Sequence, residues 1–132
     1  MTTRIVVIED HPASLELSRY LLAATGYLAL TASDGDAGLA MVEAERPDLV
    51  ICDIQLPTMD GFEVLAALRH RPHLRSIPVI AVTAFSMPGE QRKILQAGFA
   101  GYLAKPIVPE TFVEQVAAYL PPEKRLSTRQ SG

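Results

Sequence analysis

The sequence predicts an α/β fold in which a parallel sheet of five strands is covered by helices on both faces. Five short runs rich in valine, isoleucine and leucine alternate with five segments in which apolar residues recur every three or four positions. This alternation is the pattern of repeated βα units. The length of 132 residues fits a single domain, since a chain of this size buries about two thirds of its unfolded surface.

The predicted strands are the short apolar runs. We expect them at residues 5–8, 27–31, 49–53, 77–82 and 99–104. Pro78 lies near the start of the fourth run, where a strand tolerates proline. A strand therefore precedes each helical segment.

The first two helices are predicted from their ends and from an apolar stripe. Pro12 suits a first helical turn, and Gly26 ends that helix. Ser33 or Asp34 can cap the second helix, which ends before Pro47. The residues expected to face the sheet are Leu17, Tyr20, Leu21 and Ala24 in the first helix and Ala37, Ala40, Met41 and Ala44 in the second.

Three further helices complete the pattern. One follows Gly61, the next spans about residues 87–97 and stops at Gly98, and the last begins near Pro109. The residues expected to face inward are Val64, Leu65 and Leu68 in the third helix and Val113, Val116, Ala117 and Leu120 in the fifth.

The chain divides into a domain and a short polar end. We assign residues 1–120 to the domain. The segment 121–132 is polar, and we interpret it as a flexible C-terminal tail with little to bury. No second domain or internal repeat is predicted.

Composition argues against several classes of partner. The chain has 12 basic and 15 acidic side chains and a net charge of −3, which gives no electrostatic footprint for nucleic acid. No apolar run approaches the roughly 20 residues of a membrane span, and no signal-peptide core precedes the first strand. The single cysteine, Cys52, excludes an internal disulfide and fits a core position. We therefore expect a soluble, cytoplasmic protein.

Polar residues follow the predicted strands where a ligand site is expected. Right-handed crossovers cover both faces of a sheet only if the strand order reverses, and the common solution for five βα units is the flavodoxin-like order 2-1-3-4-5. Ligands then bind beyond the carboxyl ends of strands one and three. Glu9, Asp10 and Asp53 stand at those two ends, and Thr83 and Lys105 follow strands four and five. The five side chains should converge on one edge.

These residue types suit phosphoryl chemistry assisted by a metal. Carboxylates 4 Å apart repel by about 4 kcal/mol per pair at an effective dielectric near 20, and a cation relieves that repulsion. An oxygen-only ligand set with retained waters favours Mg²⁺. Lys105 and Thr83 suit phosphate oxygens, and Asp53 can attack phosphorus to form an acyl phosphate. Each residue alone could be a helix cap, a strand terminus or a surface cation, but the agreement of four strand ends favours the site.

The combined pattern resembles a response-regulator receiver domain over residues 4–120. The matching segments are Glu9-Asp10, Asp53-Ile-Gln-Leu-Pro-Thr-Met-Asp-Gly61, Thr83-Ala84 and Gly101-Tyr-Leu-Ala-Lys105-Pro106. Within that family the chain is most similar to the stand-alone, DivK-like type, through Asp53-Ile-Gln-Leu-Pro57 and Ala81-Val-Thr-Ala-Phe85. It departs from the commoner pattern by having Glu9 in place of aspartate. The bond before Pro106 is often cis in the family, and the sequence leaves its isomer open.

The resemblance implies a role for each acidic residue. Asp53 would accept a phosphoryl group from a phosphohistidine. Asp10, Asp53 and the backbone carbonyl of Gln55 would ligate Mg²⁺, and Glu9 would act through a bound water.

The resemblance also implies how the signal leaves the site. Thr83 and Lys105 would bind the phosphoryl oxygens, and Tyr102 stands at the switch aromatic, three residues before the lysine. Inward movement of Thr83 would make room for Tyr102 and alter the surface of the fourth helix, fifth strand and fifth helix. A second hypothesis is that Gln55 and Phe85 control water access and so tune the lifetime of the acyl phosphate.

The implied function is a single-domain response regulator of a two-component system or phosphorelay. Such a protein is a phosphoacceptor and not a turnover enzyme, with only self-catalysed phosphotransfer and slow self-dephosphorylation. Its partners would be a histidine kinase or histidine phosphotransferase and a downstream protein target, and it would be a monomer or a weak dimer.

Two other classes share an open α/β sheet. A phosphohydrolase of the haloacid-dehalogenase type also uses an aspartate, but it needs a second aspartate two residues later, where this chain has Gln55. A flavin-binding module is disfavoured because carboxylates at the switch point would repel the flavin phosphate. Both are therefore ranked below the receiver domain.

Overall fold

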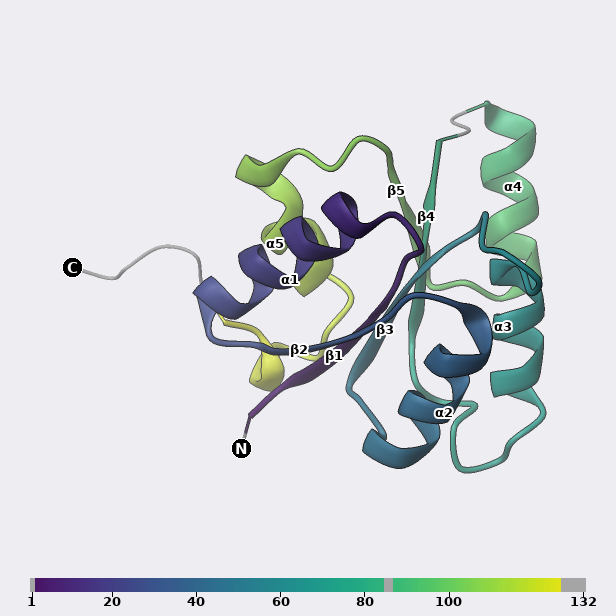
Figure 1. Cartoon of the computed structure of the whole chain (residues 1–132), viewed down its shortest axis with the longest axis horizontal. Coiled ribbons are helices and arrows are strands. Elements are labelled where there is room, and N and C mark those ends of the chain that lie inside the picture. Colours follow the sequence, from purple (N-terminus) through teal and green to yellow (C-terminus); the bar gives the residue numbers. More distant parts are fainter. Residues whose placement is uncertain (1, 85–86, 127–132) are drawn as a thin grey trace.

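The computed structural model describes residues 2–84 and 87–126. Its elements are β1 (Arg4–Ile8), α1 (Pro12–Thr25), β2 (Leu28–Ala32), α2 (Gly35–Glu45), β3 (Leu49–Asp53), α3 (Gly61–Arg69), β4 (Val79–Thr83), α4 (Pro88–Ala97), β5 (Gly101–Ala104), α5 (Pro109–Ala117) and the short 3₁₀ helix η1 (Pro122–Lys124). The strands form one sheet in the order β2-β1-β3-β4-β5, and every pairing is parallel (Figure 1). The predicted flavodoxin-like fold class and strand order are confirmed.

Two hydrophobic cores lie on opposite faces of the sheet. Helices α1 and α5 cover one face, and α2, α3 and α4 cover the other (Figure 1). Successive residues of β3 alternate between the cores, so that Ile51 packs toward α1 and α5 while Val50 and Cys52 pack toward the other helices. This alternation follows from the two-residue period of a strand. Among the described residues, no helix is both long and apolar enough to cross a membrane.

The inward faces of α3 and α5 are confirmed, because the six predicted core residues on these helices are buried, as is Leu120, which lies three residues after α5. The predicted face of α1 is wrong. Leu17 and Tyr20 are 36% and 63% exposed, and the buried residues of the helix are Ser18 and Leu22. The helix is apolar around much of its circumference, so its sequence period does not fix which face turns inward.

The predicted face of α2 is also wrong. Its buried residues are Gly35, Gly38, Leu39 and Val42, whereas Ala37, Ala40 and Ala44 are exposed. A Cβ added at Gly38 would overlap the side chain of Ile8. The helix approaches β1 closely through a glycine, which carries no apolar signal in the sequence.

The structure describes the first half of the predicted tail. Residues 121–126, which we call the C-terminal strap, contain η1 and are hydrogen-bonded to the rest of the fold. The Thr3 hydroxyl donates to the carbonyl of Lys124 at 2.9 Å, and the amide of Leu126 donates to the Tyr27 hydroxyl at 2.6 Å. Residues 121–126 are mostly exposed, in line with a segment that has little to bury; residues 127–132 lie outside the described residues, and the flexibility of the tail stays a prediction.

Candidate functional site

The carboxyl edge of the sheet collects the polar residues that follow the strands. Glu9 comes directly after β1, while Asp53 and Thr83 are the last residues of β3 and β4. The parallel register aligns these ends, since Ile8 pairs with Cys52, Asp53 with Val82 and Thr83 with Ala104. The same edge therefore receives a side chain from each of four neighbouring strands.

Three carboxylates form the centre of the site. Glu9, Asp10 and Asp53 each offer an oxygen, and these atoms all lie within 4.8 Å of one another. Glu9 and Asp53 are 6% and 2% exposed, whereas Asp10 is exposed at the rim. Two buried carboxylates at this separation need a compensating positive charge.

Lys105 supplies part of that charge. Its Nζ lies 2.5 Å from Asp53 Oδ2 and 3.3 Å from Glu9 Oε1. Partial burial opposes the charge of the lysine, but the hydrogen bond and the negative charge of Asp53, together with Glu9, raise the pKa of Lys105 above its ordinary value. The Lys105-Pro106 peptide bond is cis. The predicted meeting of this lysine with the acidic residues is confirmed.

Lys105 does not fully offset the effects that favour the protonated form of Glu9. Burial, followed by the hydrogen bond and the charge of Asp53, raises the pKa of Glu9 to about 7, although Lys105 and the backbone amide of His11 oppose the shift. The Glu9 side chain thus retains a proton readily at neutral pH when no other cation is near. An additional cation in the cluster would favour its ionised form.

The turn after β3 fixes Asp53. The Gln55 amide donates to Asp53 Oδ1 at 3.0 Å, and the Gly61 amide donates to the carbonyl of Ile54 at 2.8 Å. A Cβ at Gly61 would lie 2.7 Å from the backbone oxygen of Asp53, so the turn closes too tightly for any side chain there. Asp60 caps α3 by accepting the Glu63 amide at 2.9 Å.

The residues of the predicted switch lie next to this centre. Thr83 is buried, and Tyr102 is partly buried against the core under α2, α3 and α4. Tyr102 on β5 pairs in register with Ala81 on β4. Ala81 lies two residues before Thr83 on that strand. Phe85 lies outside the described residues, so the hypothesis about its shielding role stays a prediction.

A cavity of about 380 Å³ opens beside the acidic cluster. Glu9 and Lys105 line its polar side, and Leu17, Ala84 and Ile107 line its apolar side. Sequence reasoning missed the apolar rim because Leu17 fitted a core stripe. Leu17 lies one helical turn after Ser14, which also lines the cavity, in the helix that begins at the site. That position is the signal that could have revealed the apolar rim.

The residues present fit a hard divalent cation. The cluster offers only oxygen ligands, two of them on buried carboxylates, and burial, followed by the hydrogen bond and the charge of Asp53, raises the pKa of Glu9. It is the one group of three or more potential metal ligands in the described part of the chain. Oxygen ligands with an open, partly exposed side suit Mg²⁺, which keeps several waters.

The chain belongs to the response regulator receiver domain family, whose model matches residues 5–117. It is 40% identical over 120 residues to the polar-differentiation response regulator DivK of Brucella ovis, covering 91% of this chain and 98% of that protein. Among solved structures it is similar to the chemotaxis response regulator CheY4 of Vibrio cholerae, with a TM-score of 0.83, 28% identity and coverage of 87% and 96% of the two chains.

A second solved relative bears on the acidic cluster. The receiver domain of the sensor histidine kinase PA1611 of Pseudomonas aeruginosa has a TM-score of 0.81 and 28% identity, with coverage of 90% of this chain and 98% of that one. That domain holds a magnesium ion in its active-site cleft.

Family membership settles the class of function. The protein is a receiver domain of two-component signalling, as the sequence predicted. The phosphohydrolase alternative is not supported, because the matching family and relatives are response regulators and receiver domains.

Proposed function

We propose that the protein is the phosphoacceptor of a two-component system or phosphorelay and that Asp53 receives the phosphoryl group. The observation that carries this proposal is the position of Asp53, buried at the end of β3 between the ammonium of Lys105 and the carboxylates of Glu9 and Asp10. A carboxylate oxygen of Asp53 attacks the phosphorus of a phosphohistidine. The phosphorus–nitrogen bond breaks, and the imidazole nitrogen keeps the electron pair, leaving an acyl phosphate on Asp53.

The acidic residues would hold Mg²⁺ for this reaction. Asp10, Asp53 and the backbone carbonyl of Gln55 are the proposed ligands, with Glu9 acting through a water. When bound, Mg²⁺ supplies positive charge that stabilises the transferred phosphoryl oxygens. The grouping of three carboxylates supports the assignment, because a cation would offset both the burial of Glu9 and its repulsion by Asp53.

Lys105 and Thr83 would bind the phosphoryl oxygens and begin the signal. Lys105 already spans Asp53 and Glu9, and would exchange part of that contact for a phosphoryl oxygen. Movement of Thr83 toward the phosphoryl group would let Tyr102 turn further inward and change the surface of α4, β5 and α5. Only Ile94 of the ten residues of α4 is buried, which supports a low cost for moving that helix.

The phosphodonor would approach over α1. The exposed Leu17 and Tyr20 lie on this helix, and Leu17 also lines the cavity beside Glu9 and Lys105. An apolar surface next to a reacting carboxylate suits a histidine carried on the helix of a kinase or phosphotransferase. We propose that the protein is cytoplasmic, acts by contact with a downstream protein, and is a monomer or a weak dimer.

Phosphotransfer from the histidine kinases of the source organism tests the proposal. We expect one or a few kinases to transfer label to the wild-type chain within seconds to minutes and none to label Asp53→Ala. The matched control is Asp36→Ala, which removes an exposed carboxylate in the first turn of α2 and should be labelled normally. Equal labelling of Asp53→Ala and wild type would refute the assignment.

A further inference from the structure

The C-terminal strap, residues 121–126, is hydrogen-bonded to the amino edge of the sheet, opposite the acidic cluster. The Tyr27 hydroxyl accepts from the amide of Leu126 at 2.6 Å and donates to its carbonyl at 3.3 Å. Thr3 donates to the carbonyl of Lys124 at 2.9 Å. Thr3 and Tyr27 are both buried when the strap is in place, and their hydroxyl groups would lose these protein partners if the strap left.

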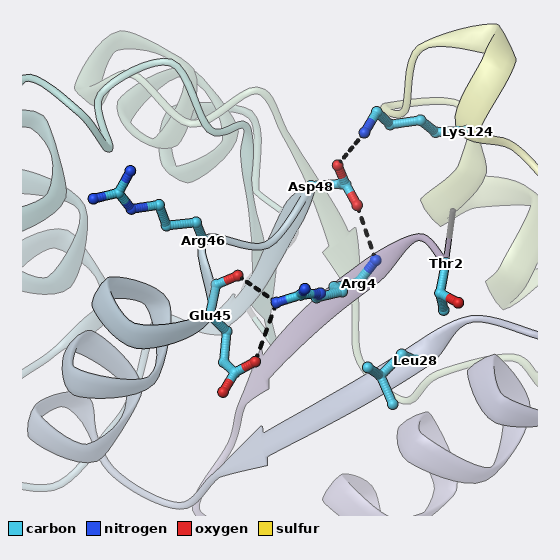
Figure 2. Close-up of a pocket in the computed structure, with 7 residues that line it drawn as sticks. All are labelled: Thr2, Arg4, Leu28, Glu45, Arg46, Asp48 and Lys124. Carbon is cyan, nitrogen blue, oxygen red and sulfur yellow. Dashed lines mark hydrogen bonds and ion pairs between the residues drawn. The ribbon is translucent and has the colours of Figure 1, made fainter.

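An ion pair joins the strap to the segment before β3. Lys124 Nζ lies 2.5 Å from Asp48 Oδ1, and Asp48 Oδ2 accepts the backbone amide of Arg4 at 2.9 Å (Figure 2). These residues line a pocket of about 630 Å³ in which Arg4 also donates to the carbonyl and carboxylate of Glu45. The pocket wall thus contains two ion pairs, Arg4–Glu45 and Asp48–Lys124, which the backbone amide of Arg4 joins into one structural network.

Arg125, between Lys124 and Leu126, links the strap to the segment that follows α5. Arg125 donates from Nε to the carbonyl of Leu120 at 2.8 Å and from Nη2 to that of Ala118 at 3.3 Å. These carbonyls follow the last turn of α5, where a helix leaves acceptors unpaired. The strap therefore connects the end of α5 to the amino ends of β1 and β3 and to the residue before β2.

Helix α4 is held with less burial: Arg69 donates to the carbonyl of its C-cap residue Gly98 at 3.3 Å, and the Lys93 ammonium lies 5.3 Å from the centroid of the Phe62 ring. Its N-cap residue, Met87, makes no side-chain capping bond, and Ile94 is its single buried residue. Helix α5 buries Phe112, Val113, Val116 and Ala117 in addition to its link through the strap. The two helices thus differ in how firmly they are held.

We propose that the C-terminal strap is an intramolecular latch that holds α5 against the amino edge of the sheet, so that α5 opens far less readily than α4. The inference is independent of the phosphorylation of Asp53, because the residues that carry it lie at the opposite edge. Its consequence is a fixed α5 beside a mobile α4. Conformational change at the α4–β5–α5 surface would therefore be larger at α4 than at α5.

Residue-resolved amide hydrogen exchange on the full chain tests the latch. The variant Thr3→Val with Tyr27→Phe removes the hydroxyl bonds and keeps the buried side-chain volumes nearly unchanged. We expect exchange of α5 and strap amides to accelerate about fivefold for each hydrogen bond removed, with β3 and α3 unchanged. In the wild type, α4 amides should exchange faster than α5 amides.

Two matched changes serve as controls. Tyr20→Phe removes the hydroxyl of an exposed tyrosine, and Thr111→Val removes a 3.5 Å hydroxyl bond to Val108 at the start of α5. Both should leave exchange across the body of α5 unchanged. Unaltered α5 exchange in the latch variant, or equal acceleration in β3 and α3, would overturn the proposal, as would equal exchange of α4 and α5 in the wild type.

Discussion

Asp53 is subject to opposing electrostatic influences from its neighbours. Lys105 stabilises its negative charge at 2.5 Å, whereas Glu9 shares the same buried space. Burial, together with the hydrogen bond and the charge of Asp53, raises the pKa of Glu9, and Lys105 offsets this only in part. At the scale of single residues, this environment supports the proposal that the site binds a cation and accepts a phosphoryl group.

Mg²⁺ should stabilise the folded protein through this cluster. At a concentration ten times its dissociation constant, we expect a gain in unfolding free energy of about 1.4 kcal/mol, measured by thermal unfolding with and without the ion. Asp10→Asn should abolish most of the gain because it removes an exposed carboxylate ligand. Asp36→Asn, which changes an acidic residue on α2, should retain it; an equal gain in both variants would argue against the cluster as the binding site.

The lifetime of the acyl phosphate should depend on Phe85. If its ring shields the bond from water, Phe85→Ala should shorten the phosphoryl half-life measured after removal of the donor. Met87→Ala is a suitable comparison, since Met87 is 70% exposed and its loss should leave the half-life unchanged. Equal half-lives for wild type and Phe85→Ala would count against shielding.

The turn between β3 and α3 is the element that positions Asp53. Gly61 allows the first turn of α3 to contact the backbone of Asp53 and Ile54 directly. The Asp60 capping box then fixes the start of α3. A change in this turn should therefore affect stability and the site together.

Gly61→Ala should destabilise the protein by about 2 kcal/mol or more, because the new Cβ would lie 2.7 Å and 2.8 Å from backbone atoms that cannot rotate away. Chemical denaturation measures the loss. Gly89→Ala adds a methyl group in open space in the first turn of α4, and should stabilise by up to about 1 kcal/mol. Similar stabilities for the two variants would show that the turn relaxes freely.

The elements also show where sequence reasoning succeeds. Strand positions were predictable from continuous apolar runs, and the inward faces of α3 and α5 from apolar residues that recur every three or four positions. The face of α1 was not, because Leu17 and Tyr20 continue an apolar period that packing against the sheet leaves outside. The face of α2 depends on Gly38, whose role is the absence of a side chain.

The site was more predictable than the strap for a physical reason. Parallel strands bring their carboxyl ends together, so Asp53, Thr83 and Lys105 could be placed at one edge from strand order alone. The strap depends on Thr3 and Tyr27, single polar residues more than 90 positions from their partners. No local period marks such contacts.

For the molecule as a whole, the two edges of the sheet carry different groups of residues. The carboxyl edge holds the acidic cluster, and the amino edge joins both chain ends through Asp48, Lys124 and Thr3. The hydrogen bonds from Lys124 and the Arg4 amide outweigh the effect of burial and hold the pKa of Asp48 below its ordinary value. Stability at the amino edge is therefore linked to pH.

Asp48→Asn should reveal this dependence. A carboxyl group whose pKa is lower in the folded state stabilises the fold at pH values above its ordinary pKa of 3.8, and that stabilisation is lost as the pH falls through the folded pKa. We expect the wild type to exceed the variant by about 1 kcal/mol or less at pH 7, because Lys124 is partly exposed. Denaturant titrations at several pH values should show the difference vanishing in acid; a constant difference would exclude the ionised carboxylate as its cause.

The most direct test of the central proposal is to locate the phosphoryl group itself. Wild-type protein phosphorylated with Mg²⁺ present should be treated with borohydride, which reduces an acyl phosphate, and mapped by peptide mass spectrometry. We predict modification at Asp53 alone, in a Mg²⁺-dependent manner, and none in Asp53→Ala. Modification at another residue, with Asp53 unmodified, would contradict it.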